Sequence, residues 1–208
     1  YAMILAVIMC SAATSRHSAR AADGQLPLQA RPETARTAQH EKGRETMAQT
    51  IRTAVEQDLD AIAAVEAECF PAAEAATRAE FAERLRYYGN HFWLLWEDET
   101  LAAFVDGMVT DAADLTDAMY ADASLHNENG AWQMIFGVNT LPEYRRRGLA
   151  GQLLETAIAA AKQQGRKGLV LTCKDKLVHY YARFGFVSEG VSGSAHGGVT
   201  WYQMRLTF

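Results

Sequence analysis

The sequence is poor in cysteine and has no excess of positive charge, and each shortage excludes a class of protein. Only three of its 208 residues are cysteines, Cys10, Cys69 and Cys173, and their odd number and spacing match no zinc or CxxC pattern. We therefore expect free thiols in a reducing, cytoplasmic environment, with neither a disulfide framework nor a metal site. The formal net charge of −5 disfavours a general nucleic-acid-binding surface.

The sequence also lacks an apolar run long enough to span a membrane. Residues 2–10 are apolar, but a membrane helix needs about twenty such residues, and no basic flank marks a signal peptide. A secretory leader is therefore the less favoured interpretation. Residues 11–46 are rich in Ala, Arg, Thr, Gln and Glu without apolar periodicity, a composition that cannot offset the entropy of ordering. We expect 1–46 to be a disordered extension, with Met47 as the natural start, and 47–208 to be the folded domain.

The rest of the chain alternates between strand-like and helix-like segments, and its length suits one domain. Asp58 is suited to cap one helix, and the Thr77–Glu80 spacing is a capping box that opens another. The patterns predict strands at 50–55, 91–96, 101–109, 133–139, 168–173, 186–188 and 199–206, and helices at 58–70, 77–88, 148–164 and 175–184. The fold class is therefore α/β (α+β), with a mixed, mostly antiparallel sheet of about seven strands flanked by about four helices.

The most informative stretch leaves a predicted strand and enters a predicted helix at residues 138–151. The first turn of a helix has backbone N–H groups without internal partners and carries partial positive charge. Glycine and alanine at this turn let a phosphate approach the backbone, and a run of arginines adds positive charge. This pattern predicts a pyrophosphate-binding loop, formed by Val138, Asn139, Thr140, Arg145, Arg146, Arg147, Gly148, Leu149, Ala150 and Gly151.

A run of arginines is equally typical of a solvated surface, so the loop alone does not decide the function. The stretch lacks GxGxxG, which disfavours a dinucleotide-binding loop, and it lacks GxxxxGK[ST], which disfavours a P-loop. Two motifs read together are more specific. Arg145-x-x-Gly148-x-Ala150 is followed about 35 residues later by Tyr181-Ala-Arg-Phe-Gly-Phe186.

This pair resembles the acetyl-CoA signature and the Y-x-x-x-G-F ending of the GCN5-related N-acetyltransferase (GNAT) superfamily, and the element order agrees over residues 50–208. The resemblance implies an N-acetyltransferase that uses acetyl-CoA as co-substrate, with direct attack of an amine on the thioester. It implies that Tyr181 is the acid that protonates the CoA sulfur. Without the motif, Tyr181 would be interpreted as a core residue, because it lies on the apolar face of its helix.

Within the superfamily, the spacing from Ser124 to Phe186 is most similar to arylalkylamine N-acetyltransferases, which implies a small primary amine of the arylalkylamine or polyamine type as substrate. Those enzymes have two histidines on the central strand that help to deprotonate the amine, and Met134 and Phe136 occupy these positions here. The base is therefore unassigned, with His126 and His196 as candidates. Apolar residues that could line the amine pocket, or pack in the core, are Phe70, Pro71, Met134, Phe136 and Trp132.

Two other functions fit the same motifs. One is acetylation of a protein lysine or N-terminus, and the other is a non-catalytic acyl-CoA-binding sensor, against which the presence of Tyr181 argues. For the leading interpretation we expect a small-molecule amine as the partner, with no nucleic acid and no membrane, and a monomer or a homodimer.

Overall fold

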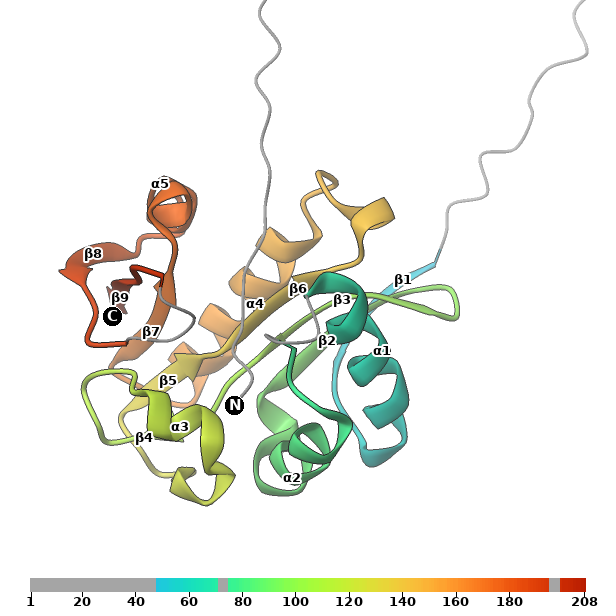
Figure 1. The fold of residues 1–208 in the computed structure, drawn as a ribbon, viewed down its shortest axis with the longest axis horizontal. Helices are drawn as coiled ribbons and strands as arrows, with labels where there is room; N and C mark the ends of the chain where they lie inside the picture. The colour runs from blue at the N-terminus through green and yellow to red at the C-terminus, as the bar shows by residue number, and fades with distance from the viewer. Residues whose placement is uncertain (1–47, 71–74, 195–198) are drawn as a thin grey trace, which may run out of the picture.

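The computed structural model describes residues 48–70, 75–194 and 199–208. Within these ranges it contains nine strands in two sheets and five α-helices (Figure 1). The expected extension 1–46, Pro71 and His196 lie outside the described residues. No helix in the described ranges has the length and apolar character needed to cross a bilayer.

The first sheet has the strand order β1-β2-β3-β6 and is antiparallel throughout. The second has the order β4-β5-β7-β9-β8, in which only β5 and β7 are parallel. The mixed, mostly antiparallel arrangement predicted from the sequence is therefore confirmed. The strands are β1 Gln49–Thr53, β2 Phe92–Glu97, β3 Thr100–Asp106, β4 Val109–Thr110, β5 Trp132–Ile135, β6 Gly137–Thr140, β7 Gly168–Cys173, β8 Val187–Val191 and β9 Tyr202–Thr207.

Strands β5 and β6 are consecutive in the chain and join the two sheets at Phe136, where the sequence predicted one continuous strand. The Phe136 N–H donates to the Asp106 carbonyl, and Gly137 is also paired with Asp106. Two residues opposite one is the geometry of a β-bulge, which shifts the register by one residue. Beyond the bulge, Leu141 N–H donates to the Ala102 carbonyl, so alternation directs the Val138 N–H away from β3.

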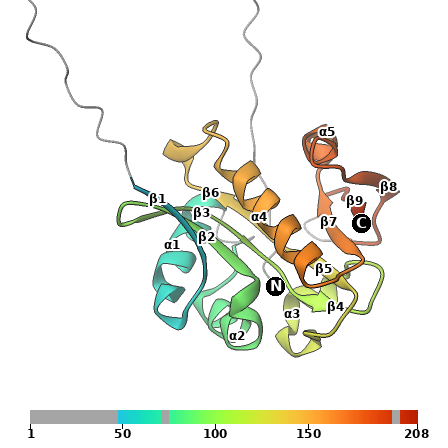
Figure 2. The ribbon, with the colours of Figure 1, turned by 180° about the vertical axis from the view of Figure 1, so that it is seen from behind.

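The helices cover opposite faces of the first sheet. Figures 1 and 2 show α1 (Leu59–Cys69) and α2 (Arg78–Tyr88) on one side and α4 (Leu149–Gln163) on the other. Each side has its own apolar core, because side chains alternate along the strands. Phe104, for example, packs in the α1/α2 core and its neighbour Val105 in the α4 core. The short helices α3 (Asp117–Ala121) and α5 (Val178–Ala182) lie beside the second sheet (Figure 1).

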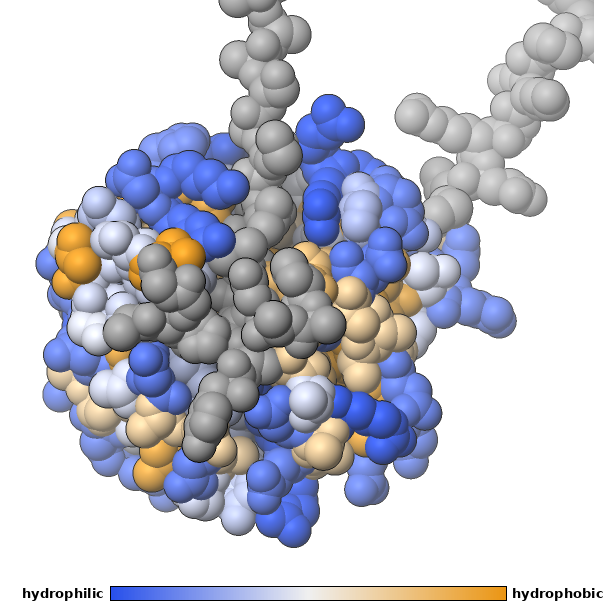
Figure 3. Space-filling view, in the orientation of Figure 1, coloured by the Kyte–Doolittle hydropathy of each residue, from blue (hydrophilic) through white to orange (hydrophobic). Residues whose placement is uncertain are grey.

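Local signals in the sequence explain where the longer helices begin and end. The predicted capping box at α2 is present: Thr77 Oγ1 accepts the Glu80 N–H at 3.2 Å, and Glu80 Oε2 accepts the Thr77 N–H at 2.7 Å. Helix α4 begins after Gly148 and is followed by Gly165, both with positive φ. The face shown in Figure 3 carries many hydrophilic side chains around smaller apolar areas, and among the described residues the most exposed large apolar ones are Val187 and Val191 of β8.

Candidate active site

The turn between β6 and α4 has the geometry of an anion-binding helix start. Pro142–Tyr144 forms one 3₁₀ turn, Arg146 and Gly148 adopt positive φ angles of 63° and 84°, and the helix follows at once. The first helical hydrogen bond runs from Gln152 N–H to the Gly148 carbonyl at 3.1 Å. No side chain caps this start, and a Cβ built on the exposed Gly148 would meet no atom within 4 Å. The first-turn amides are thus available to a ligand.

The three arginines of the turn point to different partners. Arg145 Nε donates to the Thr140 carbonyl at 3.1 Å. Arg147 makes two hydrogen bonds to the buried Glu97, at 2.7 and 2.8 Å, and lies over the Tyr144 ring. Arg146 is exposed and has no ion-pair partner in the described part of the chain. Of the three, Arg146 is therefore the guanidinium most available to a bound anion.

The three residues that follow Gly148 contribute to packing rather than to the open surface of the turn. The side chains of Leu149 and Ala150 are buried in the α4 core. A Cβ on Gly151 would come within 3.3 Å of Phe184 Cζ, so glycine at this position lets α4 approach the segment after α5. The backbone amides of these three residues are thus their contribution to the helix start.

The end of β6 divides its residues between two faces of the sheet. Strand β6 is an edge strand of the first sheet, and the Val138 N–H points to that edge. The Val138 side chain packs in the α4 core. Asn139 lies on the other face, paired with Phe104, and its side chain is 1% exposed. The Thr140 carbonyl accepts both Arg145 Nε and the Cys69 thiol.

Tyr181 lies in α5 with its side chain in the interior of the α4 core, 1% exposed. Its ring makes edge-to-face contacts with Tyr180 and Phe186. Burial, with the nearby Cys173 and Tyr180, raises the pKa of the Tyr181 phenol well above its usual value. The hydroxyl therefore keeps its proton at neutral pH, as an acid must before it can donate.

The apolar residues predicted to line an amine pocket lie in the α1/α2 core. Phe70, Met134 and Phe136 are at most 5% exposed, and the half-buried Trp132 packs against the same core. The Phe136 ring lies 4.6 Å from the Tyr120 ring, centre to centre. These side chains belong to or pack against one apolar cluster of the core, which we call the apolar wall.

A group of buried polar residues next to this wall was missed by the sequence reasoning. Glu66, Arg84 and Asp106 are at most 2% exposed and come from α1, α2 and β3. The sequence did contain a signal, because each occupies a position on an apolar face. Glu66 lies four residues after Ile62 in the same helix, a spacing that places both on one side.

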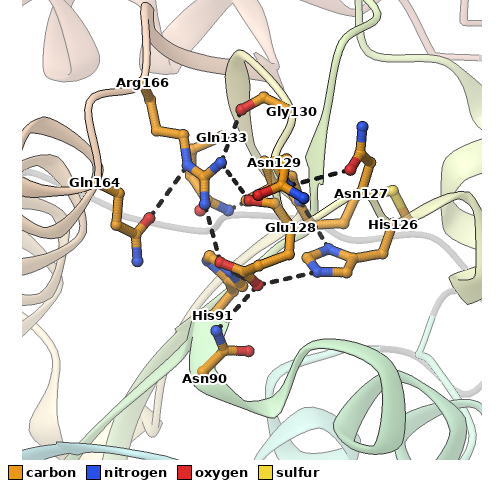
Figure 4. Close-up of polar contacts among 12 residues, drawn as sticks. Asn90, His91, His126, Asn127, Glu128, Asn129, Gly130, Gln133, Gln164 and Arg166 are labelled. Carbon is orange, nitrogen blue, oxygen red and sulfur yellow. Dashed lines mark hydrogen bonds and ion pairs between the residues drawn. The ribbon is translucent and has the colours of Figure 1, made fainter.

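His126, a candidate base, is held by two hydrogen bonds. Its Nδ1 accepts the Val109 N–H at 3.1 Å, so its Nε2 carries the hydrogen and donates to Glu128 Oε2 at 3.2 Å (Figure 4). Burial, and then the neighbouring His91, lower the pKa of His126. Neither nitrogen is free to take a proton from an amine, and the group is structural.

The same cluster has the ligand types of a metal site, since atoms of His91, His126 and Glu128 lie within 4.8 Å of one another. However, Nε2 of His126 is a donor here, and the Arg166 guanidinium already pairs with Glu128 Oε1 at 3.0 Å (Figure 4). Although partial burial acts to raise it, hydrogen bonds from His91, Asn90 and His126 hold the pKa of Glu128 at about 2. These hydrogen bonds and ion pairs fit a structural cluster centred on Glu128 better than a cation site.

Solved structures with the same fold include the loading GNATL domain of CurA from Lyngbya majuscula, which has a TM-score of 0.67 and 16% identity over 77% of this chain and 98% of that one. The GphF GNAT-like decarboxylase in complex with isobutyryl-CoA has a TM-score of 0.66 and 23% identity over 76% and 98%. PaiA N-acetyltransferase from Thermoplasma acidophilum, in complex with coenzyme A, has a TM-score of 0.58 and 16% identity over 78% and 100%.

The sequence finds no match among curated proteins. It does match the family model described as "Acetyltransferase (GNAT) family" over residues 43–186. That range contains both motifs, the turn before α4 and Tyr181. The superfamily resemblance is confirmed, and this chain belongs to the acetyltransferase (GNAT) family.

Proposed function

We propose that the chain is an acetyl-CoA-dependent N-acetyltransferase whose second substrate is a small primary amine. The observation that carries the proposal is the start of α4, where uncapped amides, an open Gly148 and Arg146, which has no ion-pair partner in the described ranges, follow one another within a few residues. Family membership supplies the acyltransferase class. The arylalkylamine-like motif spacing favours a small amine over a protein substrate.

Two observations support acetyl-CoA as the co-substrate. The donor set at the α4 start is backbone N–H groups and one free guanidinium, which suits a diphosphate. Structures with this fold were solved with coenzyme A and with isobutyryl-CoA. In the proposal the amides of residues 148–151 and Arg146 hold the pyrophosphate, while Arg145 and Arg147 support the turn through Thr140 and Glu97.

The chemistry follows from the two sides of β6. The Val138 N–H points to the strand edge and donates to the thioester oxygen as negative charge develops there, a contribution that in other enzymes amounts to a few kcal/mol. Tyr181, protonated at neutral pH, donates its proton to the leaving thiolate, which is worth about 10²–10⁴ in rate for a typical general acid. The apolar wall of Phe70, Met134 and Phe136 contacts the substrate's carbon skeleton.

A panel of acceptors tests this function. The protein is incubated with acetyl-CoA and phenethylamine, spermidine, or a peptide with a free N-terminus and lysine, and free thiol and acetylated product are measured. Product from phenethylamine or spermidine is expected. Acetylation of the peptide alone would contradict the small-amine assignment, and tight binding of acetyl-CoA with no thiol released by any acceptor would instead identify a sensor.

A further inference from the structure

A buried polar group lies between the first sheet and helices α1 and α2, and the mechanism above leaves it unused. It consists of Glu66 from α1, Arg84 from α2, Asp106 from β3 and Asn139 from β6, each at most 2% exposed. The register of β3 and β6 places Asp106 opposite Gly137 and Phe104 opposite Asn139. Asp106 and Asn139 are therefore diagonal neighbours on the face that α1 and α2 cover.

The group has more negative than positive charge. Arg84 Nη1 lies 3.5 Å from Asp106 Oδ2, and Arg84 Nη2 donates to the Tyr120 carbonyl at 3.2 Å. Within the described residues, Glu66 Oε1 accepts only the Ala76 N–H, at 3.0 Å. With both carboxyls ionised, one guanidinium faces two carboxylates, and an uncompensated buried charge is costly unless a cation joins it.

Several oxygens of the group have no hydrogen-bond partner. Within the described residues, Glu66 Oε2, Asp106 Oδ1 and both side-chain polar atoms of Asn139 are buried and have no partner in hydrogen-bond geometry. The Gly137 N–H lies close enough to the Asp106 carboxyl to lower its pKa. The Asn139 amide does lie close enough to Glu66 to lower its pKa, although its geometry falls short of a hydrogen bond. Unpartnered buried acceptors are rare in folded proteins. Three acceptor oxygens and one surplus negative charge match a primary ammonium, which has three N–H donors and one positive charge.

We propose that Glu66, Asp106 and Asn139 form the binding site for the ammonium group of the amine substrate, and that the Glu66 carboxylate takes its proton. This assignment rests on the proposed function and supplies the base that the sequence left unassigned. Asp106 and Arg84 are positioning residues. The site lies on the α1/α2 face of β6, beside the apolar wall, so an amine held there approaches the edge at which Val138 presents its N–H.

The proton balance is complete without another reagent. One ammonium proton moves to Glu66, the neutral nitrogen forms a bond to the thioester carbon, the carbon–sulfur bond breaks, and Tyr181 gives a proton to the thiolate. The second nitrogen proton then restores Tyr181, and Glu66 releases its proton to solvent. The products are the amide, the free thiol and one proton.

The electrostatics of Glu66 agree with this role. Burial raises its pKa to about 7. Four groups face it: the Ala76 N–H, Arg84 from α2 and Asn139 from β6 act to lower its pKa, while Asp106 from β3 raises it. Below pH 7 the carboxyl is protonated and cannot accept, so activity should rise as pH increases through this value.

The test compares two amines, phenethylamine, an ammonium at neutral pH, and trifluoroethylamine, which is already neutral. We expect Glu66→Gln to lower kcat/KM for phenethylamine at pH 7.5 by at least about 100-fold and to abolish the rise of activity through pH 7. With trifluoroethylamine the same variant should lose less than about threefold. Asn139→Ala should raise KM for phenethylamine about tenfold and keep a rise of activity with pH, moved to higher pH because the Asn139 amide that lowers the pKa of Glu66 is gone.

Asp60→Asn is the matched control, because Asp60 is an exposed carboxyl on the same helix. Unaltered acetyl-CoA affinity, measured by calorimetry, checks that each variant is folded. A Glu66→Gln enzyme that keeps the wild-type pH profile, or that loses both amines equally, would overturn the assignment while the acetyltransferase proposal stands. Wild-type protein that transfers no acetyl group to either amine would instead refute the proposed function and this site with it.

Discussion

At the scale of single residues, Tyr181 and Gly148 are the positions at which one substitution tests the proposed function most directly. Tyr181 packs in the α4 core, and its phenol keeps its proton at neutral pH, as the proposed acid role requires. Gly148 has a positive φ and open space around it. Strain and bulk at that position can therefore be separated experimentally.

Tyr181→Phe keeps the buried ring and removes the hydroxyl. We expect kcat to fall at least about tenfold while acetyl-CoA affinity changes little, because the proton is needed only as the thiolate leaves. Steady-state kinetics and calorimetry measure the two effects. Tyr180→Phe, at the adjacent half-buried tyrosine, is the control, and an unaltered kcat in Tyr181→Phe would remove the residue from its proposed role.

Gly148→Val places a branched side chain where the diphosphate is proposed to bind. Gly165 also has a positive φ, with open space around it, but lies at the far end of α4. Gly165→Val is therefore the control. Gly148→Val and Gly165→Val should lower Tm by a similar amount, because each strains the left-handed backbone conformation. Only Gly148→Val should weaken acetyl-CoA binding, by at least about tenfold. Equal affinities of the two variants in calorimetry would argue against diphosphate binding at the start of α4.

At the scale of elements, the sequence predicted what depends on local chemistry and missed what depends on pairing. The Thr77–Glu80 capping box and Gly165 marked helix ends correctly because these signals lie within a few residues of each other. The apolar run 133–139 was predicted as one strand, and the bulge at Phe136 divides it. That bulge depends on hydrogen bonds to Asp106, about thirty residues away, which periodicity does not reveal.

In the turn before α4, Arg147 supports the fold, whereas Arg146 is available to bind an anion. Arg147 neutralises Glu97, which is 3% exposed, whereas Arg146 has no such partner in the described ranges. We expect Arg147→Ala to lower Tm, because it leaves a buried carboxylate unpaired, with a smaller effect on acetyl-CoA affinity.

Arg146→Ala should do the reverse, weakening acetyl-CoA binding about tenfold, the loss of one charge-assisted hydrogen bond, with Tm unchanged. Thermal unfolding and calorimetry on the pair check both expectations. If Arg147→Ala weakened acetyl-CoA binding and Arg146→Ala did not, the result would show that Arg147 leaves Glu97 when the ligand binds.

At the scale of the whole molecule, the buried polar group lowers the stability of the folded state when its carboxyls are ionised, because a buried charge is costly. Its members are separated by 18 to 73 positions in the sequence, so their proximity follows only from the fold. Burial raises the pKa of Glu66 from 4.5 to about 7 and that of Asp106 to about 6. The folded state therefore binds protons more tightly than the unfolded chain at these sites, and stability is lost as the pH rises through these values.

Glu66→Gln should consequently stabilise the protein at pH 8 and have little effect at pH 5, where Glu66 is already neutral. The rise in the pKa of Glu66 to about 7 corresponds to about 3 kcal/mol, an increase in Tm of several degrees for a domain of this size. Thermal unfolding of the wild type, Glu66→Gln and Asp60→Asn at both pH values measures it. Equal Tm changes at pH 5 and pH 8 would contradict a buried titrating carboxyl.

The bulge at Phe136 directs neighbouring residues of β6 to different sides of the sheet, and protein engineering can use this separation. The bulge directs the Val138 amide to the strand edge and the Asn139 side chain to the face that α1 and α2 cover, so in the proposed mechanism neighbouring residues of one strand would contact different substrates. Directed evolution toward a new amine can therefore be confined to α1, α2 and the odd-numbered positions of β6. The α4 side would then keep its selectivity for the acyl donor through every round.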